Sequence, residues 1–97
     1  MSELDKLEQY LKENGVEYTR KDTAGLWDTH QIIVFDNGVR IWDAICHRGS
    51  YGYEKGLLEV MGDPVVKPSD GGSVCGFLTA KEVIERWTEF KNRGWWI

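Results

Sequence analysis

The residues that could carry chemistry are concentrated at positions 46–53, in a segment that reads Cys-His-Arg-Gly-Ser-Tyr-Gly-Tyr. Glycines let backbone N–H groups converge on an anion, Arg48 could pair with a phosphate or carboxylate, and Ser50 adds a donor. Tyr51 and Tyr53 offer flat faces to a base or a sugar. The segment therefore predicts a binding loop for a nucleotide-like molecule, with candidate residues His47, Arg48, Ser50, Tyr51 and Tyr53.

This loop differs from a phosphate-binding P-loop. It lacks the Gly-Lys-Ser/Thr ending, and no strand–loop–helix pattern surrounds it. The alternative interpretation is a tight structural turn whose tyrosines cover one face of a sheet.

A hairpin around Asn37-Gly38 organises the middle of the chain. The two residues separate β-branched apolar runs at 30–35 and 39–46, and both accept the positive φ of a two-residue type I′ turn. Both faces of this hairpin are largely apolar, so one of them needs a second layer, a loop or a partner subunit. The regular register pairs Asp36 with Val39, Val34 with Ile41, Ile32 with Asp43, and His30 with Ile45.

That register places His30, Asp43 and His47 on one face of the hairpin. Two imidazoles and a carboxylate are sufficient ligands for zinc or non-haem iron, and they could also form an acid–base pair. No metal-binding spacing accompanies them. A metal-dependent enzyme is therefore the weaker hypothesis, and the alternative is two half-exposed histidines with Asp43 as a polar partner.

The remaining candidate groups do not predict catalysis. Cys46 and Cys75 form no Cys-x-x-Cys pair, and we interpret both as small buried hydrophobes. Cys46 adjoins His47, but neighbouring residues of a strand point to opposite faces. The acidic residues are dispersed, without a closely spaced carboxylate pair. We therefore expect a non-enzyme without a cofactor or metal.

Five tryptophans among 97 residues indicate a binding surface, because tryptophan buries a large area with few rotatable bonds. Trp87 lies on a helical apolar stripe and is expected in the core. The segment at 95–97 either folds back on the core or docks on another chain. The candidate protein-interface residues are Trp42, Trp95, Trp96 and Ile97.

The chain predicts one α+β domain over 1–97, in which an antiparallel sheet of three to five strands packs against two helices. Ser2 is a helix N-cap, and Thr79 with Glu82 forms a capping box. Helices are expected at 2–14 and 79–93, strands at 16–21, in the hairpin, at 57–61 and at 74–78, and a surface loop at 63–72. The segment at 57–61 is ambiguous between strand and helical turn, and its flanking glycines favour the strand.

Charge and hydropathy limit the possible partners. Sixteen acidic residues against twelve basic ones give a net charge of −4, which argues against general nucleic-acid binding. No apolar run approaches the roughly 20 residues that span a bilayer, and no signal peptide is recognised. We therefore expect a cytoplasmic protein without a membrane partner.

Two blocks, Ser-Tyr-Gly-Tyr-Glu within 49–62 and Leu-Thr-Ala-x-Glu-Val within 76–83, resemble a family of small uncharacterised proteins. Members of that family occur in phages and mobile elements of Gram-positive bacteria. The resemblance transfers no activity to a residue, but it implies an accessory protein that binds a host factor. The leading hypothesis is a non-enzymatic inhibitor of a host defence system that acts by protein–protein binding in the host cytoplasm. Self-association is also expected, and the alternative is a protein that sequesters a nucleotide-like signal at Arg48–Tyr53.

Overall fold

The computed structural model describes residues 1–24 and 28–94. Within these ranges the chain forms two α-helices and five β-strands. The elements are α1 (Glu3–Glu13), β1 (Tyr18–Thr23), β2 (Thr29–Asp36), β3 (Val39–Ile45), β4 (Leu58–Met61), β5 (Val74–Leu78) and α2 (Ala80–Arg93), with short 3-10 turns at Tyr53–Lys55 and Pro68–Asp70.

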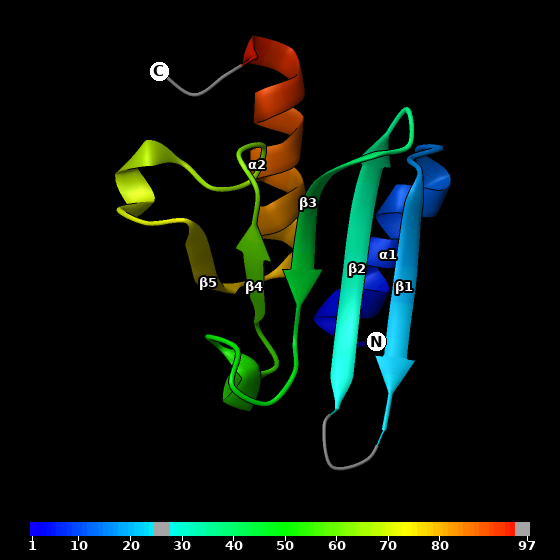
Figure 1. Ribbon diagram of the computed structural model, residues 1–97, viewed down its shortest axis with the longest axis vertical. Helices are drawn as coiled ribbons and strands as arrows, with labels where there is room; N and C mark the ends of the chain where they lie inside the picture. Colours follow the sequence, from blue (N-terminus) through cyan, green and yellow to red (C-terminus); the bar gives the residue numbers. More distant parts are fainter. Residues whose placement is uncertain (25–27, 95–97) are drawn as a thin grey trace.

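The five strands form one antiparallel sheet in the order β1-β2-β3-β4-β5. Both helices lie against the same face of this sheet, and the described residues place no helix on the other face (Figure 1). The expected α+β class, with N- and C-terminal helices packed on an antiparallel sheet, is confirmed. The segment expected at 57–61 forms strand β4.

Local sequence signals explain where the two helices begin. Ser2 Oγ accepts a hydrogen bond from the N–H of Asp5, whose carboxylate accepts from the N–H of Ser2. Thr79 and Glu82 form the same reciprocal box at the start of α2. Each helix then presents an apolar stripe to the sheet, comprising Leu4, Leu7 and Leu11 in α1 and Ala80, Val83 and Trp87 in α2.

The core contains two of the tryptophans. The ring centroids of Trp42 and Trp87 lie 5.7 Å apart, and Trp42 is only 1% exposed. The prediction that Trp42 belongs to a protein interface is therefore wrong, because its side chain lies between the sheet and the helices. The other predicted interface residues, Trp95, Trp96 and Ile97, lie outside the described residues.

The loop between β4 and β5 is less superficial than predicted. Val65 is fully buried, and Arg86 of α2 donates to its carbonyl at 2.9 Å. Arg86 also forms a two-pronged contact with Asp70 at 2.7 and 3.2 Å. The segment expected as a surface loop at 63–72 is thus tied to the second helix by a buried apolar side chain and an ion pair.

The hairpin turns at Asn37-Gly38, whose φ angles are 51° and 78°, as predicted. The predicted register holds only next to the turn, where Asp36 faces Val39. An irregularity between Val34 and Phe35 then shifts the pairing, because Ile41 is an extra residue on β3. From there on, the observed pairs are Val34 with Trp42, Ile33 with Asp43, Ile32 with Ala44, and Gln31 with Ile45.

This one-residue shift moves Asp43 to the sheet face that carries no helix. Asp43 is buried there, and its Oδ2 accepts from Gln31 Nε2 at 2.8 Å and contacts Arg40 Nη2 at 3.2 Å. Ile33 and Ile45 lie beside it, each half-buried. The uncovered face, which the sequence predicted to be largely apolar, therefore has a polar centre at Asp43.

Candidate functional site

The loop after β3 is closed by its own serine. Ser50 Oγ donates to the carbonyl of His47 at 2.7 Å and accepts from the N–H of His47 at 3.1 Å. The N–H of Ser50 donates to the same carbonyl at 2.9 Å. Because both sides of the hydroxyl are engaged in this turn, Ser50 is not a free donor for a ligand.

Most backbone N–H groups between Ser50 and Leu57 are also engaged. Six of them donate to acceptors within the protein at 2.9–3.2 Å, namely those of Ser50, Tyr51, Tyr53, Lys55, Gly56 and Leu57. An anion-binding nest needs such groups to converge on an open point. Here these six groups donate to acceptors of the protein itself, five of them to carbonyls of the loop and that of Tyr51 to Glu59 of β4.

A cavity of about 340 Å³ lies at this loop, and Ser50, Tyr51 and Tyr53 line it. Two other predicted ligand residues, His47 and Arg48, do not line this cavity. His47 Nδ1 instead accepts a hydrogen bond from the N–H of His30 at 3.3 Å. The structure thus brings together three of the five residues predicted to bind a ligand.

Phe77 of β5 completes the cavity and was not predicted. Its side chain is 57% exposed, and its φ of 59° lies in the left-handed region that costs a non-glycine residue about 1 kcal/mol. The N–H of Phe77 donates to the carbonyl of Tyr51 at 3.2 Å. A signal was available in the sequence, because a glycine inside a strand, here Gly76, indicates a bulge or a close backbone approach.

Gly76 allows that close approach. A Cβ atom at this position would collide with the Cβ atom of Tyr51. Tyr51 therefore rests directly on the backbone of the edge strand β5, and its N–H is held by Glu59 Oε1 at 2.9 Å. We call the exposed side chains of Tyr51, Tyr53 and Phe77 the aromatic patch.

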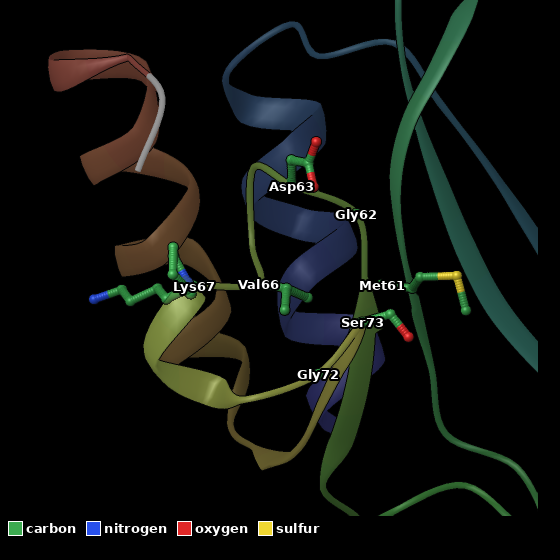
Figure 2. A pocket seen from close by; sticks show the side chains of 8 residues that line it. Met61, Gly62, Asp63, Val66, Lys67, Gly72 and Ser73 are labelled. Atoms are coloured by element: carbon green, nitrogen blue, oxygen red, sulfur yellow. The ribbon is translucent and has the colours of Figure 1, made fainter. Parts of the chain in front are cut away.

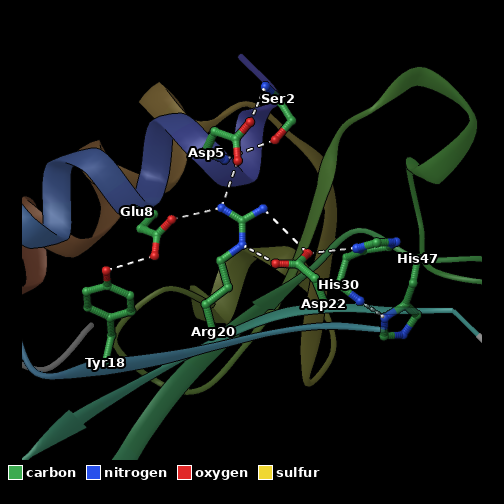
Figure 3. A network of polar contacts seen from close by, with 8 residues as sticks. All are labelled: Ser2, Asp5, Glu8, Tyr18, Arg20, Asp22, His30 and His47. Carbon is green, nitrogen blue, oxygen red and sulfur yellow. Dashed lines mark hydrogen bonds and ion pairs between the residues drawn. The ribbon is translucent and has the colours of Figure 1, made fainter. Parts of the chain in front are cut away.

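A polar network connects α1 to the strand β1 (Figure 3). The Arg20 guanidinium contacts Asp5 at 2.8 Å, Glu8 at 3.0 Å and Asp22 at 2.8 Å. Hydrogen bonds from the backbone and hydroxyl of Ser2 and from Arg20 lower the pKa of Asp5 to about 2, the backbone bond of Ser2 being the largest cause. Through these three carboxylates and one guanidinium, the network joins helix α1 to strand β1.

The network continues to His30. Its Nδ1 lies 2.8 Å from Asp22 Oδ1, and this hydrogen bond is the main reason that the pKa of Asp22 is lowered. A cavity of about 590 Å³ opens beside these two residues and is also lined by Cys46 and Leu57. Cys46 is half-buried, whereas the sequence predicted a buried thiol.

The predicted metal site is not formed. The bulge places Asp43 on the uncovered face, away from His30, so the expectation that His30, Asp43 and His47 share a face is wrong. Within residues 1–24 and 28–94, no group of three or more His, Cys, Asp or Glu side chains is arranged to hold a metal ion.

A further cavity of about 470 Å³ lies along the loop between β4 and β5 (Figure 2). It is lined by Met61, Asp63, Val66 and Lys67, among others. Lys67 Nζ lies 3.3 Å from Glu89 Oε2 of α2, so the cation is already paired.

The fold and the site define an α+β protein with an exposed aromatic patch at one end of its sheet. Comparison of the chain with models of known families, with curated proteins and with solved structures finds no match. Neither described helix combines the length and the apolar composition that crossing a membrane requires.

Proposed function

We propose that this chain is a non-enzymatic binding protein that inhibits a host defence system by covering a surface of a host protein. The aromatic patch of Tyr51, Tyr53 and Phe77 is the proposed contact, and the chain is an accessory protein of a phage or mobile element. The observation that carries the proposal is Phe77, a large apolar side chain that is 57% exposed and held in a strained backbone conformation.

The patch has the physical properties of a binding hot spot. Tyr51 and Phe77 are 60% and 57% exposed, and tyrosine is enriched among residues that dominate binding energy. Their main chains are joined by a hydrogen bond, and Tyr51 rests on Gly76. A contact surface that is rigid before binding loses little conformational entropy when a partner arrives.

The origin in a phage or mobile element depends on the resemblance of two segments to a family of such proteins. Those segments, 49–62 and 76–83, are separated in the sequence and meet at the aromatic patch. Tyr51 and Tyr53 belong to the first, and Phe77 belongs to the second. This meeting supports the patch as the part of the chain through which such a protein acts.

Binding of a nucleotide-like molecule at Arg48–Tyr53 is the second candidate, and one observation favours it. Tyr51 and Tyr53 line a cavity of about 340 Å³, where a base could stack on a ring. Six N–H groups of residues 50–57 and the Ser50 hydroxyl are engaged within the protein, so fewer donors are left to hold a phosphate. The protein surface is therefore the better-supported partner.

The test measures plating of a phage on Gram-positive hosts that each carry one defence system, with and without this protein. The wild type is expected to restore plating on at least one host, and Phe77→Gly is expected to abolish the effect. Glycine adopts the left-handed conformation freely, so this variant removes the ring while preserving the fold.

Val39→Ala is the matched control, because Val39 is 64% exposed at the opposite end of β3. This variant is expected to behave as the wild type. Full activity of Phe77→Gly, or no activity of the wild type on any host, would contradict the proposal. A large rise in melting temperature with cyclic dinucleotides or ADP-ribose derivatives, lost in Arg48→Ala, would replace it with the second candidate.

A further inference from the structure

The hairpin turn between β2 and β3 is held by a carboxylate from another part of the chain. Glu17 lies between α1 and β1, and its carbonyl accepts a hydrogen bond from the N–H of Phe35 at 2.9 Å. Its side chain reaches the turn, where Oε1 accepts from the N–H of Gly38 at 3.0 Å. Glu17 therefore holds the backbone nitrogen that directly follows Asn37, and both turn residues are exposed.

We propose that Asn37 is a site of spontaneous deamidation and that Glu17 is the residue that restrains the reaction. Loss of the Glu17 contact then starts an irreversible change in the turn. This inference is independent of the proposed function, because the turn and the loop that carries Tyr51 and Tyr53 lie at opposite ends of β3 and the reaction needs no partner.

The reaction needs only the two turn residues and water. The Gly38 nitrogen gives up its proton and attacks the side-chain carbonyl carbon of Asn37, an approach that no side chain of Gly38 hinders. The bond from this nitrogen to Cγ forms, the bond from Cγ to Nδ2 breaks, and Nδ2 leaves with the electron pair and the proton as ammonia. Water then opens the resulting five-membered succinimide at either carbonyl carbon, which yields aspartate or isoaspartate.

Glu17 opposes the first step of this reaction in two ways. Its carboxylate binds the proton that must leave the Gly38 nitrogen, and a hydrogen bond to an ionised acceptor is stronger than one to a neutral acceptor. Its charge also disfavours a second negative charge on the nitrogen that it contacts. The turn is held with φ of 51° at Asn37 and 78° at Gly38. Succinimide formation therefore requires local opening of this contact.

The products do not fit the turn as asparagine does. Conversion of the amide to a carboxylate adds a negative charge next to Asp36 and near Glu17, and like charges repel. Isoaspartate also lengthens the main chain by one atom within a turn of two residues. Because loop length and turn type fix the register of a hairpin, this product disturbs the pairing of β2 with β3.

A second Asn-Gly pair, Asn14-Gly15 at the end of α1, provides an internal reference. Both of its residues are exposed, and the N–H of Gly15 donates to the carbonyl of Lys12 at 3.3 Å. The Asn14 amide donates to the carbonyl of Tyr10 at 2.8 Å. These acceptors are neutral and belong to α1, so the Asn14 rate reports whether the end of this helix stays folded in each variant.

The experiment incubates the folded full-length protein at slightly alkaline pH and follows both asparagines by peptide mass mapping, which detects the acid and separates its two isomers. In the wild type, Asn37 is expected to convert more slowly in the folded protein than in urea. Glu17→Ala is expected to accelerate its conversion in the folded protein about 10-fold, the change that corresponds to losing a hydrogen bond to a charged group. Glu17→Gln keeps an acceptor without the charge, and its rate is expected to lie between the two.

Two controls separate the contact from other effects. In urea, all three proteins are expected to convert Asn37 at the same rate, because the contact is absent there. A variant that does not fold would accelerate Asn14 as well, and if Glu17→Ala does so, Glu17→Gln decides. An Asn37 rate that is unchanged or slower in the folded variant, or equal in folded and urea-treated wild type, would overturn the proposal.

Discussion

The N–H of Phe77 donates to the carbonyl of Tyr51 at 3.2 Å and thereby fixes the loop after β3 to the edge strand β5. This hydrogen bond requires the left-handed conformation of Phe77 and the absence of a side chain at Gly76. The exposed aromatic patch is therefore built from side chains, such as those of Tyr53 and Phe77, that lie 24 or more positions apart in the sequence.

The backbone conformation of Phe77 predicts an unusual order of stabilities. Phe77→Gly is expected to be more stable than Phe77→Ala by about 1 kcal/mol, because alanine retains the cost of a positive φ and glycine does not. Urea denaturation of the two variants measures the difference. Equal stability, or a more stable alanine variant, would show that φ at this position is not a constraint.

The contact between Gly76 and Tyr51 predicts that a single methyl group destabilises the protein. Gly76→Ala is expected to lower the free energy of unfolding by about 1–3 kcal/mol, because the new Cβ would collide with the Tyr51 Cβ. Gly72→Ala is the matched control, since no atom lies within 4 Å of its Cβ position. Thermal melting of both variants tests the contact, and similar losses in the two would contradict it.

Signals that act within a few residues were readable from the sequence. The capping boxes at Ser2 and Thr79 define the helix starts through side-chain bonds to the next turn. The Asn37-Gly38 turn depends on the φ preferences of two residues. These features need no knowledge of distant parts of the chain, which is why the helices and the hairpin turn were predicted correctly.

The predicted hairpin register was wrong because a bulge at Ile41 interrupts it, where a residue distant in the sequence packs against β3. Gly62, with φ of 120°, approaches the Ile41 carbonyl and Trp42 so closely that a Cβ atom there would collide with both. The alternation of apolar and polar residues in the hairpin gives no indication of this packing. The same shift moved Asp43 to the face opposite His30 and brought Cys46 opposite His30, so the three residues predicted as metal ligands do not share a face.

Self-association remains a prediction for the full chain. We expect the wild type to sediment as an oligomer at micromolar concentration and Trp95→Ala with Trp96→Ala to sediment as a monomer, because a tryptophan that docks on another chain buries a large area with few rotatable bonds. Met61→Lys tests the uncovered sheet face separately, since Met61 is 49% exposed on β4. A monomeric wild type would remove self-association from the functional account.

The ion pair between Arg86 and Asp70 connects the β4–β5 loop to α2. Arg86 Nη1 lies 2.7 Å from Asp70 Oδ2, and the two side chains are only 16% and 14% exposed. The hydrogen bond from Arg86 is the largest of the causes that lower the pKa of Asp70 below its ordinary value. The charged carboxylate is thus favoured in the folded protein.

This lowered pKa predicts how stability depends on pH. A carboxylate with a lower pKa in the folded state stabilises the protein above its unfolded pKa, and this contribution is lost as the pH falls through the folded pKa. We expect the free energy of unfolding to fall below about pH 5, and Asp70→Asn to cost about 1–3 kcal/mol near neutral pH while weakening that fall. Asp36→Asn, at an exposed position before the hairpin turn, should leave the pH dependence unchanged. Urea denaturation at a series of pH values separates the two variants, and an undiminished fall in Asp70→Asn would show that the ion pair does not bind the loop to the helix.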